Sequence, residues 1–259
     1  MIQVENIHVQ FGEVVVLRDI SFEVQRGETV CILGGSGGGK STLLKTMIGV
    51  LQPTSGRVLF DGEDMTHARR KELNRIRRKF GVTFQSGALL NSMTVRENIA
   101  LPLEQHSDLD AETIDTMVKI KLHQVDLLHA ADRCPSEISG GMQKRAAVAR
   151  ALALDPKAIF YDEPSAGLDP IAVRRLDELI NDLRDSMGIT SVVVSHVMES
   201  VRRIADRVIM LDKGQVIHNG TVAELEASDD PRVQRFLTAE SDGGERAVTE
   251  TQFLQQLLG

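Results

Sequence analysis

The sequence contains little cysteine and no long apolar run. Its two cysteines, Cys31 and Cys134, are far apart and show no metal-ligand spacing, which fits a reducing compartment. Cys31 lies in the apolar stretch TVCILG, which favours a small core residue over a reactive thiol. No stretch approaches the roughly 18 apolar residues that a membrane-spanning helix needs. If the function involves a membrane, we expect another chain to supply the membrane-spanning part.

The sequence also lacks an excess of positive charge. The formal net charge is −7, which disfavours a generic nucleic-acid-binding protein, although local basic runs are present. The N-terminal segment MIQVENIHVQFG has no basic stretch followed by an apolar one, so we expect no secretory signal. The chain has 259 residues, 42% of them hydrophobic, which is enough for one large domain or for a core with a subdomain.

Short apolar runs alternate with helical patterns along the chain. The runs TVCIL, AIFYD, SVVVS and RVIML are typical of strands that are buried on both faces. Helical patterns follow the first two, as STLLKTMIGVL and PIAVRRLDELINDLRDS. This alternation predicts a mainly parallel α/β core. Residues 86–156, between the first two runs, have a mainly helical pattern.

A glycine-rich loop, GGSGGGKST, follows the first apolar run and precedes a predicted helix, as the motif G-x-x-x-x-G-K-[ST] requires. It comprises Gly34, Gly35, Ser36, Gly37, Gly38, Gly39, Lys40, Ser41 and Thr42. Glycines let the main-chain amides face a phosphate group, and the helix N-terminus adds partial positive charge. Lys40 would reach the β- and γ-phosphates, and Ser41 would bind Mg²⁺. The flanking strand and helix disfavour the alternative, a merely flexible loop.

Two adjacent acids, Asp162 and Glu163, end the apolar run AIFYD in the stretch AIFYDEP. Ligands bind at the carboxyl edge of strands in open α/β sheets, so this position favours a site. We expect Asp162 to hold Mg²⁺ and Glu163 to polarise the attacking water. The alternative is that these two residues are ordinary surface acids, and the presence of a phosphate loop in the same chain disfavours that interpretation.

The sequence predicts a second helix N-terminus that could bind an anion. Ser139, Gly140 and Gly141 precede a helical run in SEISGGMQKRAAVARAL, and one triphosphate does not need two such ends. We therefore expect this end to complete the partner's site in a head-to-tail dimer. Asp169 in SAGLDP could fix that interface, and His196, at the end of VVVSH, could contact the γ-phosphate. A structural role is the alternative for His196, which its place between a strand and a helix disfavours.

Together these motifs resemble, in order, those of the ABC ATPase family over residues 1–237. The resemblance implies a P-loop NTPase (RecA-like) core with an antiparallel β subdomain and an α-helical subdomain at about residues 86–156. By the same resemblance, Gln85 in FGVTFQSG is the Q-loop residue and a third magnesium ligand, and Phe11 stacks on adenine. The resemblance also implies that Lys40, Glu163 and His196 are the catalytic residues and that ATP and Mg²⁺ are the cofactors. The family's signature motif corresponds here to ISGGMQ, residues 138–143, which departs from the family pattern at Ile138 and Met142, where leucine and glutamine are usual.

The contacts that the resemblance implies in trans come from Ser139, Gly140, Gly141, Met142 and Asp169. Three function classes share such a cassette: a transporter ATPase, a soluble ATPase of translation or DNA repair, and an inactive regulatory cassette. The transporter ATPase is favoured because the chain has a single cassette, because only a short stretch of sequence separates Lys40 from Ser139, and because the net charge is negative. The intact Lys40, Asp162, Glu163 and His196 disfavour the last.

The segment FQSGALLNSMTVRENIALPL resembles the MlaF-like branch, whose ATPases energise MCE-type lipid transporters. This resemblance implies an ATPase homodimer beneath integral-membrane permease subunits, with an MCE-domain protein and a small accessory subunit, and no nucleic acid. It also implies a peripheral place on the cytoplasmic face of the inner membrane and a phospholipid substrate. An importer or exporter of another substrate stays open as an alternative.

Two other segments have two interpretations each. The basic run HARRKELNRIRRKF is either a solvated helix face, which we favour, or a surface near anionic lipid, where each charge contributes about 1 kcal/mol. The tail, residues 238–259, could end in a short amphipathic helix that packs on a partner, or it could be a disordered terminus.

Overall fold

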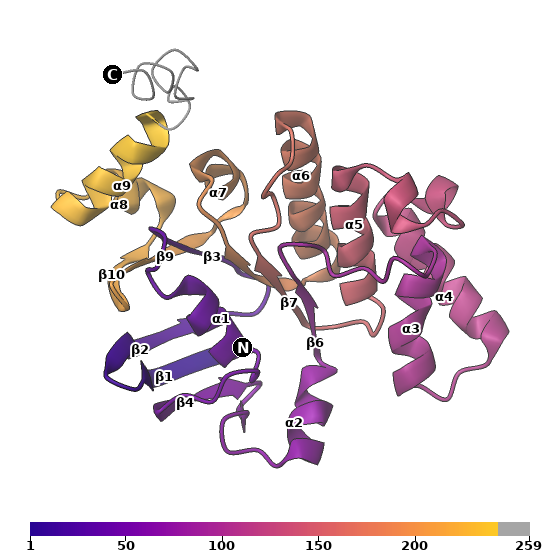
Figure 1. Cartoon of the computed structure of the whole chain (residues 1–259), viewed down its shortest axis with the longest axis horizontal. Helices are drawn as coiled ribbons and strands as arrows, with labels where there is room; N and C mark the ends of the chain where they lie inside the picture. The colour runs from indigo at the N-terminus through magenta and orange to yellow at the C-terminus, as the bar shows by residue number, and fades with distance from the viewer. Residues whose placement is uncertain (243–259) are drawn as a thin grey trace, which may run out of the picture.

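A computed structural model describes residues 1–242, which form two β-sheets flanked by helices (Figure 1). The smaller sheet is antiparallel, with strand order β2-β1-β4-β5. Its strands are β1 (Ile2–Phe11), β2 (Val14–Val24), β4 (Ser55–Phe60) and β5 (Glu63–Asp64). The alternation of apolar and polar residues in β1 gives this sheet one buried face.

The larger sheet has six strands in the order β10-β9-β3-β8-β7-β6 and is parallel except for the edge strand β10. In chain order its strands are β3 (Thr29–Gly34), β6 (Phe80–Thr83), β7 (Ala158–Asp162), β8 (Thr190–Val194), β9 (Arg207–Asp212) and β10 (Gln215–Gly220). The predicted mainly parallel α/β core is therefore confirmed. The turn at Lys213-Gly214, where both residues have positive φ, reverses the chain into β10.

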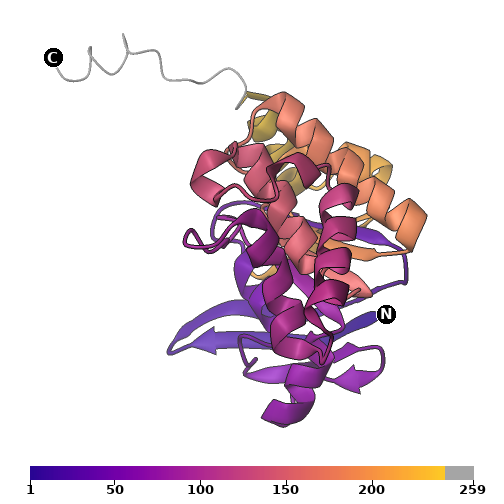
Figure 2. The same ribbon diagram turned by 90° about the vertical axis from the view of Figure 1, so that its right-hand side faces the viewer.

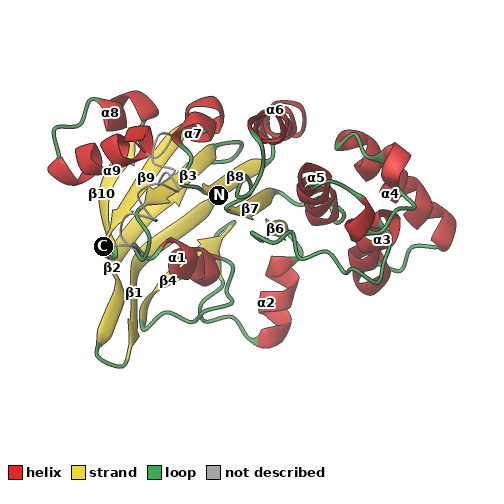
Figure 3. Cartoon of the chain, turned by 45° about the horizontal axis from the view of Figure 1, so that its top comes forward, coloured by secondary structure: helices red, strands yellow, loops and turns green. Residues whose placement is uncertain are grey.

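Helices cover the larger sheet, and a group of them stands apart from it (Figures 2 and 3). The helices are α1 (Lys40–Met47), α2 (Arg70–Arg77), α3 (Val95–His106), α4 (Ala111–Gln124), α5 (Gly140–Ala151), α6 (Pro170–Met187), α7 (Met198–Ile204), α8 (Val222–Glu226) and α9 (Pro231–Asp242), with 3-10 turns at Leu128–Ala130 and Pro135–Glu137. Helices α3 and α4 form the separate group, at the right of Figure 3, whereas α5 lies between that group and the sheet and packs against β6. Across residues 1–242, no helix combines the length and the apolar character needed to cross a membrane.

The core has two parts, one on each face of the larger sheet. In β3, Val30 and Ile32 pack with α1 and the smaller sheet, whereas Cys31 and Leu33 face the opposite cluster with α5, α6 and α7. Every residue of β3 is buried. This burial explains why its sequence is a continuous apolar run, and it confirms Cys31 as a core residue.

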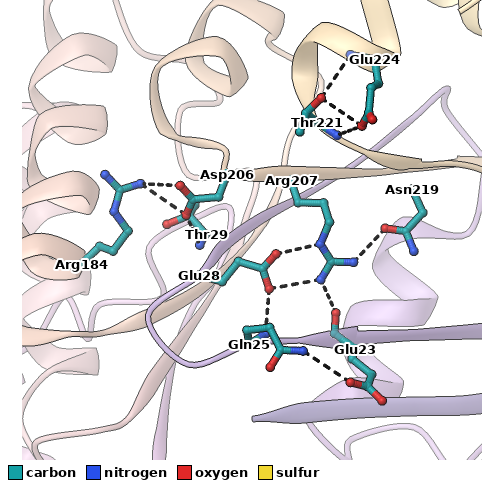
Figure 4. A network of polar contacts seen from close by, with 10 residues as sticks. All are labelled: Glu23, Gln25, Glu28, Thr29, Arg184, Asp206, Arg207, Asn219, Thr221 and Glu224. Carbon is teal, nitrogen blue, oxygen red and sulfur yellow. Dashed lines mark hydrogen bonds and ion pairs between the residues drawn. The ribbon is translucent and has the colours of Figure 1, made fainter.

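Charged side chains fasten the larger sheet to the end of the smaller one (Figure 4). The Arg207 guanidinium of β9, in the larger sheet, donates to the Glu23 carbonyl of β2, in the smaller one. It also donates two bonds to the Glu28 carboxylate, at 2.7 and 3.1 Å, and one to Asn219 Oδ1 at 2.8 Å. Nearby, the Asp206 carboxylate accepts from the Thr29 amide at 2.8 Å and pairs with Arg184 of α6 at 3.3 Å. These contacts fix the start of β3, which carries the phosphate loop at its other end.

Two predicted segments can now be located. In the basic run, Ile76 is buried and the Arg77 guanidinium donates to the carbonyls of Ile48 and Gly49, so α2 packs on the core as the favoured interpretation expects. The boundary expected at residue 237 lies inside α9, which runs from Pro231 to Asp242. The amphipathic helix expected in the tail falls beyond the described residues.

Candidate functional site

The glycine-rich loop joins β3 to α1 and lines a cavity of about 730 Å³. This volume lies within the roughly 300–1,000 Å³ that is usual for small-molecule sites. The lining comprises Val16, Gly34, Gly35, Ser36, Gly37, Gly38, Gly39, Lys40, Ser41, Thr42, Glu163, His196 and Phe236. All nine predicted loop residues therefore face one cavity.

Glycine is required where the loop runs close to its neighbours. Gly34 has a φ of +147°, and a Cβ there would clash with the Leu211 carbonyl of β9. Gly39, with a φ of +99°, is the N-cap of α1, and its Cβ would lie 2.7 Å from Leu17 Cδ2. In the described structure no side chain caps α1, so its first amides remain available to an anion. The cavity and these amides fit the triphosphate of a nucleotide.

Lys40 begins α1 and is almost fully buried at the loop. Its ammonium donates to the carbonyls of Gly34 and Gly35, at 2.7 and 3.0 Å. Burial lowers the pKa of Lys40, and the charges of Glu163 and Asp162 oppose that shift. The cation is therefore held where it can meet a phosphate group.

The two acids at the end of β7 line different cavities. Glu163 has a φ of +46°, a strained conformation for a non-glycine residue, and its amide donates to the Val194 carbonyl of β8 at 2.9 Å. Glu163 lines the loop cavity, whereas Asp162 lines an adjoining cleft. Burial and the charge of Glu163 raise the pKa of Asp162, while Lys45, Lys40 and Lys144 act against that rise. A bound cation would stabilise the charged form of this carboxylate.

His196 follows β8 and reaches the same cavity as Glu163. Its Nδ1 lies 3.5 Å from Glu163 Oε1, too far for a strong hydrogen bond but close enough for both to contact one ligand. The Ser195 hydroxyl, buried just before it, accepts from the Val197 amide at 3.1 Å and fixes the chain there. The ring itself is 49% exposed and can adjust to a ligand.

Gln85 is exposed and shares the adjoining cleft, about 500 Å³ in volume, with Asp162, Ala166 and Gly167. The structure thus brings Gln85 near Asp162, while Ser41 faces the loop cavity. The three predicted magnesium ligands offer a hydroxyl, a carboxylate and a carboxamide, which are the hard oxygen donors that Mg²⁺ prefers. Within residues 1–242, no group of three or more His, Cys, Asp or Glu could hold a metal alone.

The residues expected to act in trans gather on a separate surface. Ser139 caps α5, accepting from the Met142 amide at 3.3 Å, and Asp169 caps α6, accepting from Ile171 and Ala172 at 3.0 Å. A Cβ on Gly141 would lie 3.0 Å from Ala172 Cβ, so the two helix starts are in contact. Neither Ser139 nor Asp169 lines the loop cavity of its own chain.

Several residues that the motifs do not mark also reach this region. Phe236 of α9 and Val16 of β2 are the apolar part of the cavity lining. Lys144 and Arg150 of α5 bind main-chain carbonyls in the segment after β6.

Two residues that the resemblance marks do not line the loop cavity. Phe11, expected to stack on adenine, is 53% exposed and lies outside the lining. Met142 packs on the apolar core, where the family's glutamine would be polar.

Comparisons with known proteins agree with this geometry. The family model for ABC transporters matches residues 17–166, more than half of the chain. The phospholipid transport ATP-binding protein MlaF of Haemophilus influenzae is 42% identical over 94% of this chain and 92% of its own length. The probable ribonucleotide transport ATP-binding protein mkl of Mycobacterium leprae is 40% identical over 93% of this chain and 70% of its own length.

Solved structures give the same result. The dimeric ATP-binding cassette MJ0796, in a post-hydrolysis state with ADP and Pi, matches with a TM-score of 0.79 and 32% identity. The match covers 86% of this chain and 99% of that one. Family model, relatives and structures thus agree with the phosphate loop and its cavity. The chain belongs to the ABC transporter family and is one of its ATP-binding, ATP-hydrolysing subunits.

Proposed function

We propose that this ATPase drives the transport of phospholipid between membranes. The observation that carries the proposal is the 42% identity, over nearly the full length of both chains, to a protein named for phospholipid transport. In this proposal the chain is a homodimer on the cytoplasmic face of the inner membrane. It acts with separate permease subunits, an MCE-domain protein and a small accessory subunit.

Each chain would bind one ATP in its loop cavity. The amides of the loop and of α1 bind the phosphates, Lys40 neutralises their charge, and the apolar lining contacts the rest of the nucleotide. Ser41, Gln85 and Asp162 would hold Mg²⁺, which when bound supplies positive charge to the phosphate oxygens. The cleft that Gln85 and Asp162 share supports this assignment, because it brings a carboxamide and a carboxylate oxygen donor together.

Hydrolysis would use Glu163 and His196. Glu163 orients a water molecule and accepts its proton as the oxygen attacks the γ-phosphorus and the bond to the β–γ bridging oxygen breaks. The strained backbone at Glu163, and the hydrogen bond that its main-chain amide donates to the Val194 carbonyl, hold the carboxylate at the cavity. His196, 3.5 Å from Glu163, positions the γ-phosphate. Lys40 stabilises the charge that develops.

The second helix start would complete the partner's site. Gly140 and Gly141 lie against Leu168 and Ala172, the residues around the start of α6 that Asp169 caps. None of residues 139–142 lines the loop cavity of its own chain, which supports a role across a dimer interface. Closure of Ser139 and Gly141 over the partner's γ-phosphate would sandwich two ATP molecules between two chains. Loss of that phosphate on hydrolysis removes the bridging ligand, so the dimer opens.

A second candidate is transport of ribonucleotides, since relatives with 39–40% identity are named for it. A soluble ATPase of translation or DNA repair is a third and less favoured candidate. The cassette itself does not distinguish these substrates, because they bind to other chains of the complex.

The test is reconstitution of the transporter. The tagged chain is co-expressed with a permease and an MCE-domain protein from the same organism, and the purified complex is placed in phospholipid vesicles. ATP-dependent transfer of fluorescent phospholipid between vesicle and MCE protein is then measured. We expect transfer with the wild-type chain and with Glu178→Gln, an exposed acid of α6, and none with Glu163→Gln.

Two results would contradict the proposal. ATP-dependent uptake of labelled ribonucleotide without phospholipid transfer would favour the second candidate. Co-purification with ribosomal or DNA-repair proteins instead of a permease would favour the third.

A further inference from the structure

The segment that carries Gln85 is attached to α5 through its main chain. The Lys144 ammonium donates to the Gln85 carbonyl. The Arg150 guanidinium donates to the Ala88 carbonyl at 2.6 Å and to the Gly87 carbonyl at 3.0 Å. Two cations from one helix therefore hold three carbonyls of a four-residue segment.

The same segment has an unusual backbone that packs directly on α5. The Gly87 amide donates to the Phe84 carbonyl at 2.7 Å, and Gly87 and Ala88 have φ values of +74° and +48°. A Cβ on Gly87 would lie 3.8 Å from Ala147 Cβ of α5. In β6, a Cβ on Gly81 would clash with the Ala151 carbonyl at the other end of that helix. Strand β6 and the turn after it therefore rest on α5 along its length.

Lys144 also lies close to the cleft at the end of β7. Gln85, whose carbonyl accepts from Lys144, lines that cleft together with Asp162. Lys144 belongs to α5, the helix that Ser139 caps. Its contact with Gln85 therefore joins this helix to the segment beside the acids of the hydrolytic site.

We propose that Lys144 is a positioning residue that couples the Ser139 end of α5 to the hydrolytic site of its own chain. This inference rests on the proposed paired sites and adds a link between them. Ser139 and Lys144 are five positions apart on one helix, about 7.5 Å along its axis. A shift of α5 as Ser139 meets the partner's nucleotide therefore carries Lys144 with it. Lys144 then moves the Gln85 main chain relative to Asp162 and Glu163.

A neighbouring arginine provides a matched control. Arg145 follows Lys144 on α5, is likewise partly buried and also donates to main-chain carbonyls, those of Val125 and Asp126. Those carbonyls lie just after α4, in the separate helical group, and not beside Gln85. If cations of α5 serve only to hold the fold, the loss of Arg145 and the loss of Lys144 should have the same consequences.

The experiment compares full-length Lys144→Gln, Lys144→Arg and Arg145→Gln with the wild type. We expect Lys144→Gln to lower kcat for ATP about 10- to 100-fold, the loss expected for one charge-assisted hydrogen bond. The Kd for a fluorescent ATP analogue should change less than about threefold, because the loop cavity is intact. Lys144→Arg should keep kcat within about threefold of wild type, since it restores a cationic donor. Arg145→Gln should lower Tm without a selective loss of kcat.

Three results would overturn the coupling. The first is a wild-type kcat in Lys144→Gln. The second is that Lys144→Gln and Arg145→Gln lose kcat and Tm to the same extent, and the third is that Lys144→Arg loses kcat as Lys144→Gln does. Glu163→Gln is measured in the same assay to separate this inference from the proposed function. If the wild type hydrolyses ATP and Glu163→Gln does not, the proposed catalytic site stands whatever Lys144 does. If Glu163→Gln hydrolyses ATP normally, the proposed site fails, and the coupling to it fails as well.

Discussion

The loop cavity and the surface around Ser139 both present a helix N-terminus, but the chain builds them differently. At the cavity, strand ends from β3, β7 and β8 converge on α1, and Lys40 is buried among carbonyls. At the second surface, the starts of α5 and α6 touch each other, and Ser139 and Asp169 are both exposed. The first is a formed binding site, and the second is a surface that faces away from its own chain's cavity.

This difference separates two kinds of defect. Changes in the cavity should alter what one chain does alone, which is to bind nucleotide. Changes at the second surface should leave that binding intact and affect only what two chains do together. Substitutions at the two surfaces test this separation.

The largest effect should come from Glu163→Gln, which removes the group expected to accept the proton of water. Loss of a general base costs about 10²- to 10⁴-fold in rate, and we expect phosphate release to fall by at least that lower figure. ATP affinity should stay within about twofold, because the amide keeps the size of the side chain. With ATP and magnesium, size-exclusion chromatography should show a dimer that persists. Glu178→Gln is the control, and a wild-type rate in Glu163→Gln would remove Glu163 from catalysis.

Ser139→Arg should have the next largest effect and tests the second surface alone. A bulky cation at the start of α5 would block its approach to another chain, so we expect turnover to fall about 10- to 100-fold, as for loss of one phosphate-binding donor. The Kd of the single chain for ATP should not change. Ser136→Arg, exposed in the 3-10 turn just before the signature, is the control. Weaker nucleotide binding by the Ser139→Arg monomer would contradict a role in trans.

Lys40→Ala should weaken ATP binding itself, in contrast to Ser139→Arg. The buried ammonium is replaced by a methyl group, so a charge-assisted bond to phosphate is lost and Kd should rise about tenfold or more. Equilibrium binding of a fluorescent ATP analogue measures this directly, with Lys71→Ala on the exposed face of α2 as the control. An unchanged Kd would count against the phosphate-loop assignment.

The sequence predicts the cavity well where its geometry is local. Gly34 to Thr42 are contiguous, so one motif specifies the whole phosphate cradle. Asp162, Glu163 and His196 each follow a buried apolar strand, and parallel strands bring such ends to one edge of the sheet. Knowing the order of the strands is therefore enough to predict that these three side chains lie at the same edge of the sheet.

The remaining site depends on contacts between distant segments. Phe236 reaches the cavity because α9 packs back onto the core through the buried Val233. Val233, Phe236 and Leu237 recur at helical spacing, but this pattern does not specify which surface the helix covers. Lys144 is one of several cations in α5, and only the packing of β6 on that helix selects it. Phe11 illustrates the reverse case, because a motif suggests it while the structure places it outside the cavity lining.

The smallest expected effect distinguishes these two aromatic residues. Phe236→Ala should weaken ATP binding about three- to tenfold, because it removes an apolar wall that binding would otherwise bury. The chain contains no tryptophan, so Phe236→Trp adds a single reporter whose fluorescence should change when ATP binds. Arg235→Ala, exposed on α9, is the control. A loss of affinity in Phe11→Ala but not in Phe236→Ala would assign base stacking to the motif residue. The reverse result would show that the C-terminal helix forms part of the nucleotide site.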